Sequence, residues 1–207
     1  MVVGAVIKWF ASPSTSPTGL TWDGKTLWHC DVNTDLIYQV NPATGAVIKS
    51  FAAPALDPKG LAWDGKTLWH SDSGTDRIYQ INPITGAVIK WFASPNLEPW
   101  DLAWDGKTLW NGDNTTDRIY QINPMTGAVI KSFVSPGVQP FGLTWDGHTL
   151  WNADSNLNRI HQVNPITGAV IRWFASPDLY PRGLTWDGHT LWVTTANLNR
   201  IYQLETH

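Results

Sequence analysis

The sequence repeats itself five times at a fixed interval of 41 residues. The tripeptide Trp-Asp-Gly marks the same point of every copy, without an insertion or deletion between copies, at Trp22, Trp63, Trp104, Trp145 and Trp186. A constant period of this length is typical of arrays in which each unit buries its apolar surface against its neighbours. The five copies fill almost all of the 207 residues. The sequence therefore predicts one domain, residues 1–207, with no separate linker or catalytic insertion.

One copy, residues 58–98, divides into four short segments of β type, and none shows helical periodicity. These segments are 60–63, 67–71, 77–81 and 87–92. Asp64-Gly65, between the first two, is typical of a two-residue hairpin turn. Between the last two, Pro83 presets a turn and Gly86 suits a left-handed position. Four antiparallel strands every ~40 to 45 residues are typical of one propeller blade. We expect an all-β, five-bladed β-propeller.

The two ends of the chain carry complementary parts of one blade. Residues 4–10 match the fourth segment of a copy, and residues 200–204 match the third. We expect residues 4–10 to supply the outer strand of the blade formed by residues 182–204. This pairing would cover an open sheet edge, and it predicts a closed monomer of twenty strands.

Composition excludes some classes of partner. The net charge is −3 and charges of both signs are interspersed, which argues against a nucleic-acid groove. No apolar run approaches the ~20 residues of a spanning helix, and no signal peptide is recognisable. We expect a soluble protein of unknown compartment. The single cysteine, Cys30, rules out an internal disulfide and is interpreted as a small buried residue.

Tryptophan is unusually frequent, with fourteen residues. Ten occupy two positions of the repeat, and we expect these rings to fill the space between neighbouring blades. The alternative is a carbohydrate-binding propeller, in which the second of these tryptophans stacks on a sugar and an aspartate three residues later holds its hydroxyls. The residues of that alternative are Trp28, Trp69, Trp110 and Trp151 with Asp31, Asp72, Asp113 and Asp154. A third set, Trp9, Trp91 and Trp173, alternates with Ser50 and Ser132, and we expect it to be partly exposed.

Differences between the copies concentrate in two connections of each repeat, the one before the first segment and the one between the second and third. In an up-and-down blade these connections emerge on the same rim, where binding groups are usually placed. At the entry to the first segment stand Thr18, Lys59, Trp100, Phe141 and Arg182. Two cations and two aromatic rings predict a pocket for an anionic or planar ligand at the channel mouth. The alternative is unconstrained variation of surface loops.

A second candidate position holds His29, His70, Asn111 and Asn152, with Val193 in the fifth copy. We assign these four polar residues to the same ligand site. Two histidines near Asp31 and Asp72 could ligate a divalent ion, but a third ligand at a recognisable spacing is missing. The sequence therefore predicts no metal and no cofactor. It contains no glycine-rich phosphate loop and no nucleophile elbow.

The repeat resembles the blades of NHL-type and streptogramin-lyase-like propellers. The likeness rests on residues 58–64, Pro-Lys-Gly-Leu-Ala-Trp-Asp, followed by Leu68-Trp69, Asp72 and Arg77-Ile78-Tyr79. It covers all five copies and implies the fold, whereas those families include enzymes, sensors and RNA binders. The chain is also similar in blade number to propeller-type glutaminyl cyclases. Their Glu-Ser-Thr segment is replaced here by His70-Ser71-Asp72.

These observations predict a propeller without enzymatic activity. It would serve as a binding module for a small anionic or sugar ligand or for a protein, or as a near-symmetric scaffold. A lectin with repeated sites is the first alternative, and a metal-dependent lyase or cyclase at the channel mouth is the second. The near-identity of the copies indicates either little divergence since duplication or deliberate construction.

Overall fold

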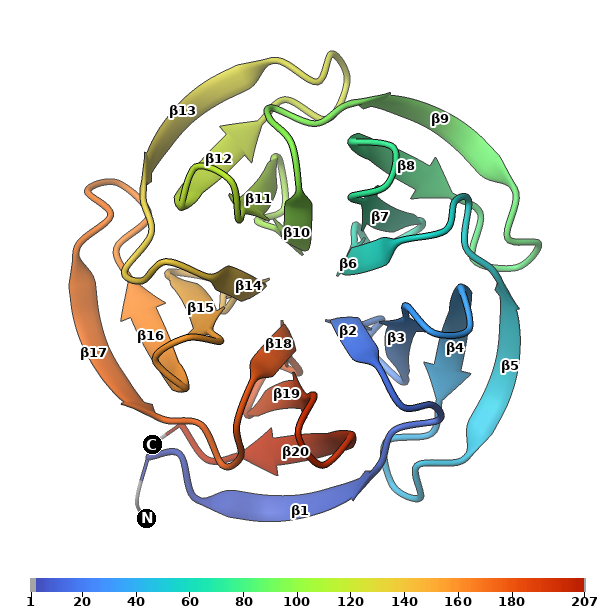
Figure 1. Cartoon of the computed structure of the whole chain (residues 1–207), viewed down its shortest axis with the longest axis vertical. Helices are drawn as coiled ribbons and strands as arrows, with labels where there is room; N and C mark the ends of the chain where they lie inside the picture. Colours follow the sequence, from blue (N-terminus) through green and yellow to red (C-terminus); the bar gives the residue numbers. More distant parts are fainter. Residues whose placement is uncertain (1–2, 207) are drawn as a thin grey trace.

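The computed structural model describes residues 3–206. Residues 1–2 and 207 of the predicted domain lie outside the described part. Five four-stranded antiparallel sheets are arranged as blades around a central channel (Figure 1). In blade 1, β2 (Pro17–Trp22) lies next to the channel, followed outward by β3 (Leu27–Asp31), β4 (Leu36–Val40) and β5 (Val47–Ala52). The expected all-β, five-bladed architecture is confirmed.

The same order of strands recurs in the next three blades. Blade 2 contains β6 (Pro58–Trp63), β7 (Leu68–Asp72), β8 (Arg77–Ile81) and β9 (Val88–Ala93). Blade 3 contains β10 (Pro99–Trp104), β11 (Leu109–Asp113), β12 (Arg118–Ile122) and β13 (Val129–Val134). Blade 4 contains β14 (Pro140–Trp145), β15 (Leu150–Asp154), β16 (Arg159–Val163) and β17 (Val170–Ala175). The predicted segments agree with these strands to within two residues.

Blade 5 is completed by the beginning of the chain, as predicted. Its strands are β18 (Pro181–Trp186), β19 (Leu191–Thr195), β20 (Arg200–Leu204) and, outermost, β1 (Val6–Ala11). Trp9 pairs with Tyr202 and Phe10 with Ile201 across the β1–β20 ladder. Figure 1 shows β1 lying beside β20 at the perimeter of the ring. The ring is therefore closed by backbone hydrogen bonds.

The turn between the first two strands of a blade differs by one residue from the prediction. The Asp64 N–H donates to the Thr67 carbonyl at 3.2 Å, so Gly65 and Lys66 are the central pair. Gly65 has a φ of 94°, whereas Asp64 is not among the residues of positive φ. The reason is the Asp64 side chain, which accepts the N–H groups of Lys66 and Thr67 at 2.9 and 2.6 Å. The last turn follows the prediction, with Gly86 at a φ of 75°.

The apolar core lies between blades rather than within them. One cluster joins Trp28, Cys30 and Ile37 of blade 1 to Leu61 and Tyr79 of blade 2, and related clusters fill the other four interfaces. The second tryptophan of each copy is 1–2% exposed, which confirms its predicted place between the blades.

The outer strands present the third set of tryptophans. Trp9, Trp91 and Trp173 are 50–51% exposed, as expected from their exchange with serine. Among residues 3–206 no helix is long and apolar enough to cross a membrane.

Candidate functional site

The five variable residues at the entry to the innermost strands occupy one position of β2, β6, β10, β14 and β18. Four of them meet at the channel mouth. The Trp100 and Phe141 rings stack at a centroid distance of 3.5 Å and an interplanar angle of 9°. Thr18 turns away instead, and its hydroxyl donates to the Pro58 carbonyl at 2.9 Å. The two rings therefore pack against each other at the mouth.

The two cations of the mouth flank this aromatic pair. The Lys59 ammonium lies 4.9 Å from the Trp100 ring centroid and forms an ion pair with Asp57 at 2.6 Å. The Arg182 guanidinium carbon lies 5.9 Å from the same centroid. Its Nη1 has only long contacts, 3.4 Å to Ser16 Oγ and 3.5 Å to the Pro17 carbonyl.

Arg182 is the less satisfied of the two cations. Among residues 3–206 its buried Nε has no hydrogen-bond acceptor, and no carboxylate forms an ion pair with it. Burial lowers the pKa of Arg182, while the charge of Asp31 acts in the opposite direction. Burying a cation without an ionic partner is unfavourable, so this side chain is suited to an anionic partner that the described residues do not provide.

Sequence reasoning missed Asp101, which lies on β10 below the mouth. Its side chain is fully buried. One carboxylate oxygen accepts the N–H of Leu61 at 3.0 Å, and the other accepts those of Leu143 and Leu184 at 3.0 and 3.1 Å. Blades 2, 4 and 5 thus donate to one carboxylate of blade 3. Burial raises the pKa of the Asp101 carboxyl well above its ordinary value, and the N–H donors oppose that effect.

A signal for Asp101 was present in the repeats. The other four copies have glycine at this position, namely Gly19, Gly60, Gly142 and Gly183. A Cβ atom at Gly142 would overlap the Arg182 carbonyl oxygen, and one at Gly183 would overlap that of Thr18. Because glycine is required by crowding in the other copies, the aspartate in the third copy indicates a residue whose side chain makes specific contacts.

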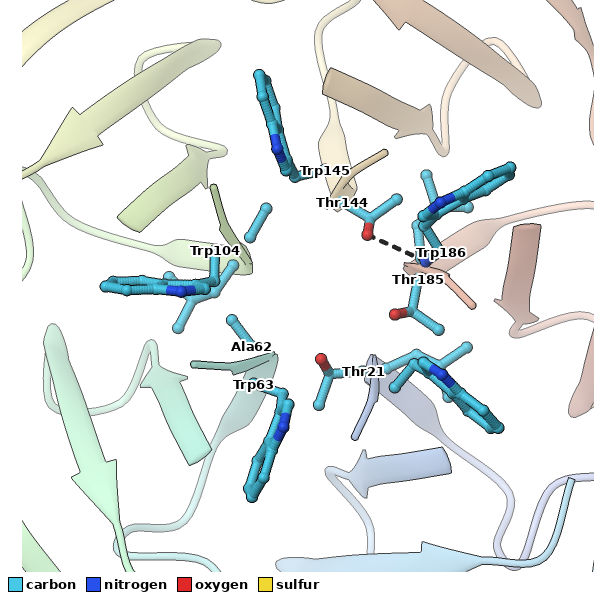
Figure 2. A pocket seen from close by; sticks show the side chains of 13 residues that line it. Thr21, Ala62, Trp63, Trp104, Thr144, Trp145, Thr185 and Trp186 are labelled. Carbon is cyan, nitrogen blue, oxygen red and sulfur yellow. Dashed lines mark hydrogen bonds between the residues drawn. The ribbon is translucent and has the colours of Figure 1, made fainter. Parts of the chain in front are cut away.

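Beyond Asp101 the innermost strands line a cavity of about 160 Å³. Figure 2 shows Thr21, Thr144 and Thr185 directed toward the axis, while the Trp-Asp-Gly tryptophans point outward between the blades. The Thr144 hydroxyl accepts the N–H of Trp186 at 3.1 Å. Leu102 and Leu184, which adjoin the Asp101 carboxylate, also line this cavity. The wall is therefore mainly hydroxyl and main-chain groups.

The other four candidate residues lie one strand further from the axis and are fully buried: His29, His70, Asn111 and Asn152. His70 Nδ1 lies 3.0 Å from the Gly60 carbonyl, and Asn152 Nδ2 donates to the Gly142 carbonyl at 2.9 Å. These side chains connect the second strand to the innermost strand. The structure brings Lys59, Trp100, Phe141 and Arg182 together and keeps these four apart from them.

Burial also controls the charge of the two histidines. It lowers the pKa of both His29 and His70 to about 4, although the neighbouring Asp31 and Asp72 carboxylates act to raise it. His29 Nε2 lies 3.1 Å from the Ser12 hydroxyl. Within residues 3–206 no group of three or more His, Cys, Asp or Glu side chains is placed to hold a metal ion.

The repeated Trp and Asp positions are engaged within the protein. Trp69 is 2% exposed, and its Nε1 donates to Asp64 at 2.9 Å. Asp72 is fully buried and accepts the N–H groups of Asp57 and Thr75, both at 2.9 Å. Neither the indole face nor the carboxylate is free to contact a sugar in this arrangement.

Comparison with solved structures shows the same fold in several proteins. Glutaminyl cyclase of Myxococcus xanthus has a TM-score of 0.82 and 12% identity, over 98% of this chain and 96% of the cyclase. Virginiamycin B lyase of Staphylococcus aureus, in a complex with quinupristin, has a TM-score of 0.56 and 19% identity, over 96% and 72%. The Swd1 propeller of Myceliophteria thermophila has a TM-score of 0.61 and 11% identity, over 99% and 100%. No protein-family model and no curated protein sequence matches the chain.

These neighbours correct one prediction. The prediction of a propeller without enzymatic activity is contradicted, because the similar structures include a cyclase and a lyase. The expected likeness to streptogramin-lyase-like propellers is confirmed at the level of fold. At these identities the likeness carries the fold alone.

Proposed function

We propose that the protein binds a small ligand at the channel mouth and that the ligand presents an anionic group to Arg182. The observation that carries this proposal is the state of Arg182, whose Nε has no acceptor among residues 3–206. A guanidinium binds carboxylate or phosphate through two parallel hydrogen bonds. The contacts of Arg182 Nη1 to Ser16 Oγ and the Pro17 carbonyl are long, so they are weak enough to be exchanged for hydrogen bonds to such a ligand.

The rest of the mouth supports an anion more than a flat aromatic ligand. One face of Trp100 is covered by Phe141, and the Lys59 ammonium stands 4.9 Å from the ring. A planar ligand would have to displace one of these neighbours. Lys59 is paired with Asp57, whereas Arg182 has no such partner among residues 3–206, so Arg182 is the cation of the mouth that favours an anionic group.

Isothermal titration with inorganic phosphate and with benzoate tests this proposal. Arg182→Gln removes the guanidinium, and the loss of charge-assisted hydrogen bonds of about 1.5–3 kcal/mol should weaken binding about 10- to 150-fold. Arg118→Gln is the matched control. It makes the same change of charge on β12, where the guanidinium contacts Ser132 Oγ at 2.9 and 3.1 Å. Equal affinity of wild type and R182Q, or no binding by wild type, would refute the proposal.

The enzymes of this fold provide two further probes. Incubation with a glutaminyl peptide and with quinupristin, followed by mass spectrometry, asks whether the bound molecule is also converted. Turnover that R182Q abolishes and R118Q retains would make the mouth a catalytic site with the same anion-binding residue. Stoichiometric binding without conversion would make it a binding site only.

A further inference from the structure

The channel axis carries a concentration of main-chain N–H groups that all point to one side chain. The N–H donors of Leu61, Leu143 and Leu184 come from three blades and meet the Asp101 carboxylate at 3.0–3.1 Å. Each carboxyl oxygen of Asp101 thus accepts at least one main-chain N–H group. Among residues 3–206 no cation forms an ion pair with this group. The Asp101 carboxyl is therefore held by main-chain donors of three blades.

From this arrangement we propose that the inner strands form an anion-binding site for one small monovalent carboxylate, which the chain fills with the side chain of Asp101. Converging main-chain N–H groups are a recurrent way to bind anions in proteins. The innermost strand of a propeller blade has one unpaired edge, so its N–H groups are available to a partner in the channel. Here one carboxylate satisfies donors of three blades together.

The repeats indicate that this site belongs to the ring rather than to blade 3 alone. Glycine occupies the same position in the other four copies. Added Cβ atoms at Gly60, Gly142 and Gly183 would collide with the carbonyl groups of the next blade. The ring therefore has room for a single carboxylate at this level, and one aspartate among four glycines meets that requirement.

The channel also holds open space next to the site. The cavity of about 160 Å³ is lined by Leu102 and Leu184, which adjoin residue 101, and by three threonines. Asp101→Gly removes a CH2–carboxylate group, and acetate carries the same carboxylate. Because its methyl group is not bonded to Cα, acetate would take the vacated space together with part of the adjoining cavity. Glycine is compatible with the backbone there, as the four other copies show.

Thermal unfolding of D101G in increasing acetate tests the proposal. The midpoint should be lower than that of wild type and should rise saturably with acetate, by about 2–4 °C at a few times the dissociation constant. Native mass spectrometry should find one acetate per chain. D101N fills the same volume, so it should lose stability and respond to acetate no more than wild type does. Any response of wild type reports binding at Arg182, and the rise expected for D101G is the part that exceeds it.

The mouth and the channel site are separated by a double variant. D101G/R182Q lacks the guanidinium of the proposed ligand site but keeps the inner-strand N–H groups. Its midpoint should still rise with acetate, whereas that of R182Q alone should not, because R182Q lacks the guanidinium and its channel site is filled by Asp101. A D101G midpoint that rises no more with acetate than that of wild type would overturn the proposal.

A measurement that needs no glycine variant keeps the test decisive if D101G does not fold. In wild type the amide protons of Leu61, Leu143 and Leu184 should resonate downfield of ordinary amide protons, because they donate hydrogen bonds to the Asp101 side chain. In D101N these three signals should move upfield, whereas the amides of outer strands should stay in place. Unchanged positions of the three signals would contradict the proposed site.

Discussion

At the scale of single residues, the Trp-Asp-Gly motif is explained by its aspartate. Asp64 accepts the N–H and hydroxyl of Thr67 at 2.6 Å each and the indole N–H of Trp69 at 2.9 Å. Burial alone would raise the pKa of this carboxyl, but the hydrogen bonds outweigh that effect and hold the pKa below its ordinary value. One carboxylate thus shapes the turn and satisfies the buried indole. The sequence showed the Trp-Asp-Gly motif, and only the structure showed that Asp64 accepts a hydrogen bond from the Trp69 indole.

The two buried histidines predict a pH dependence of stability. Folding lowers the pKa of His29 and His70 from 6.5 to about 4 through burial. Between these values the unfolded chain binds more protons than the folded one, so stability decreases as the pH falls from 6.5 to 4. The slope is at most about 1.4 kcal/mol per pH unit for each histidine.

The repeats supply the test of this pH effect, because Asn111 and Asn152 occupy the same position in blades 3 and 4. His29→Asn with His70→Asn should flatten the dependence of the unfolding free energy on pH between 4 and 6.5, measured by urea denaturation. His161, whose pKa burial also lowers, remains in the double variant as a smaller contribution. An unchanged slope would show that the two imidazoles are not the groups that titrate.

At the scale of elements, the two faces of β1 have different environments, one packed against a neighbouring blade and one exposed. Phe10 packs on Trp192 at a centroid distance of 6.0 Å. Trp9 is half exposed, and the Arg200 guanidinium lies 3.6 Å from its ring centroid. The alternation of burial follows from the twofold period of a strand. The sequence predicted both the pairing of β1 with β20 and the exposure of Trp9.

Two substitutions in β1 should therefore have unequal effects. Trp9→Ser should cost less than about 1 kcal/mol, because an exposed cation–π contact contributes little and serine stands at this position in two other copies. Phe10→Ala should cost about 2–4 kcal/mol, because it removes a ring from the interface with blade 1. Calorimetry of both variants checks the order. A larger loss for W9S would mean that β1 is held mainly by its outer face.

At the scale of the whole molecule, the spacing of the blades is set by glycines next to the axis. A Cβ atom at Gly183 would overlap the Thr18 carbonyl oxygen and lie 2.6 Å from the Leu20 nitrogen of blade 1. At Gly183 the backbone groups of two neighbouring blades thus come closer than a Cβ atom permits. Similar crowding occurs at Gly19, Gly60 and Gly142, whereas blade 3 carries Asp101 at this position.

Gly183→Ala should consequently destabilise the protein strongly, by several kcal/mol, because backbone atoms of two blades must separate. Gly74→Ala is the matched control, since an added Cβ there lies 3.3 Å from its nearest neighbour, Asp57 Cβ, in a loop of the rim. Thermal unfolding should show a large decrease for G183A and a small change for G74A. Similar midpoints for the two variants would mean that the ring adjusts its diameter easily.

The sequence by itself determined the elements and their number. The 41-residue period, the turn residues and the alternation of apolar residues depend on local geometry, so they predicted five blades, their strands and the closure by β1. The tertiary structure decided which of the variable residues meet. It placed Arg182 beside Trp100, buried His29 and His70, and brought the N–H groups of three blades to Asp101. These contacts join residues 40–83 positions apart along the chain, where the sequence pattern of one repeat gives no information about distance.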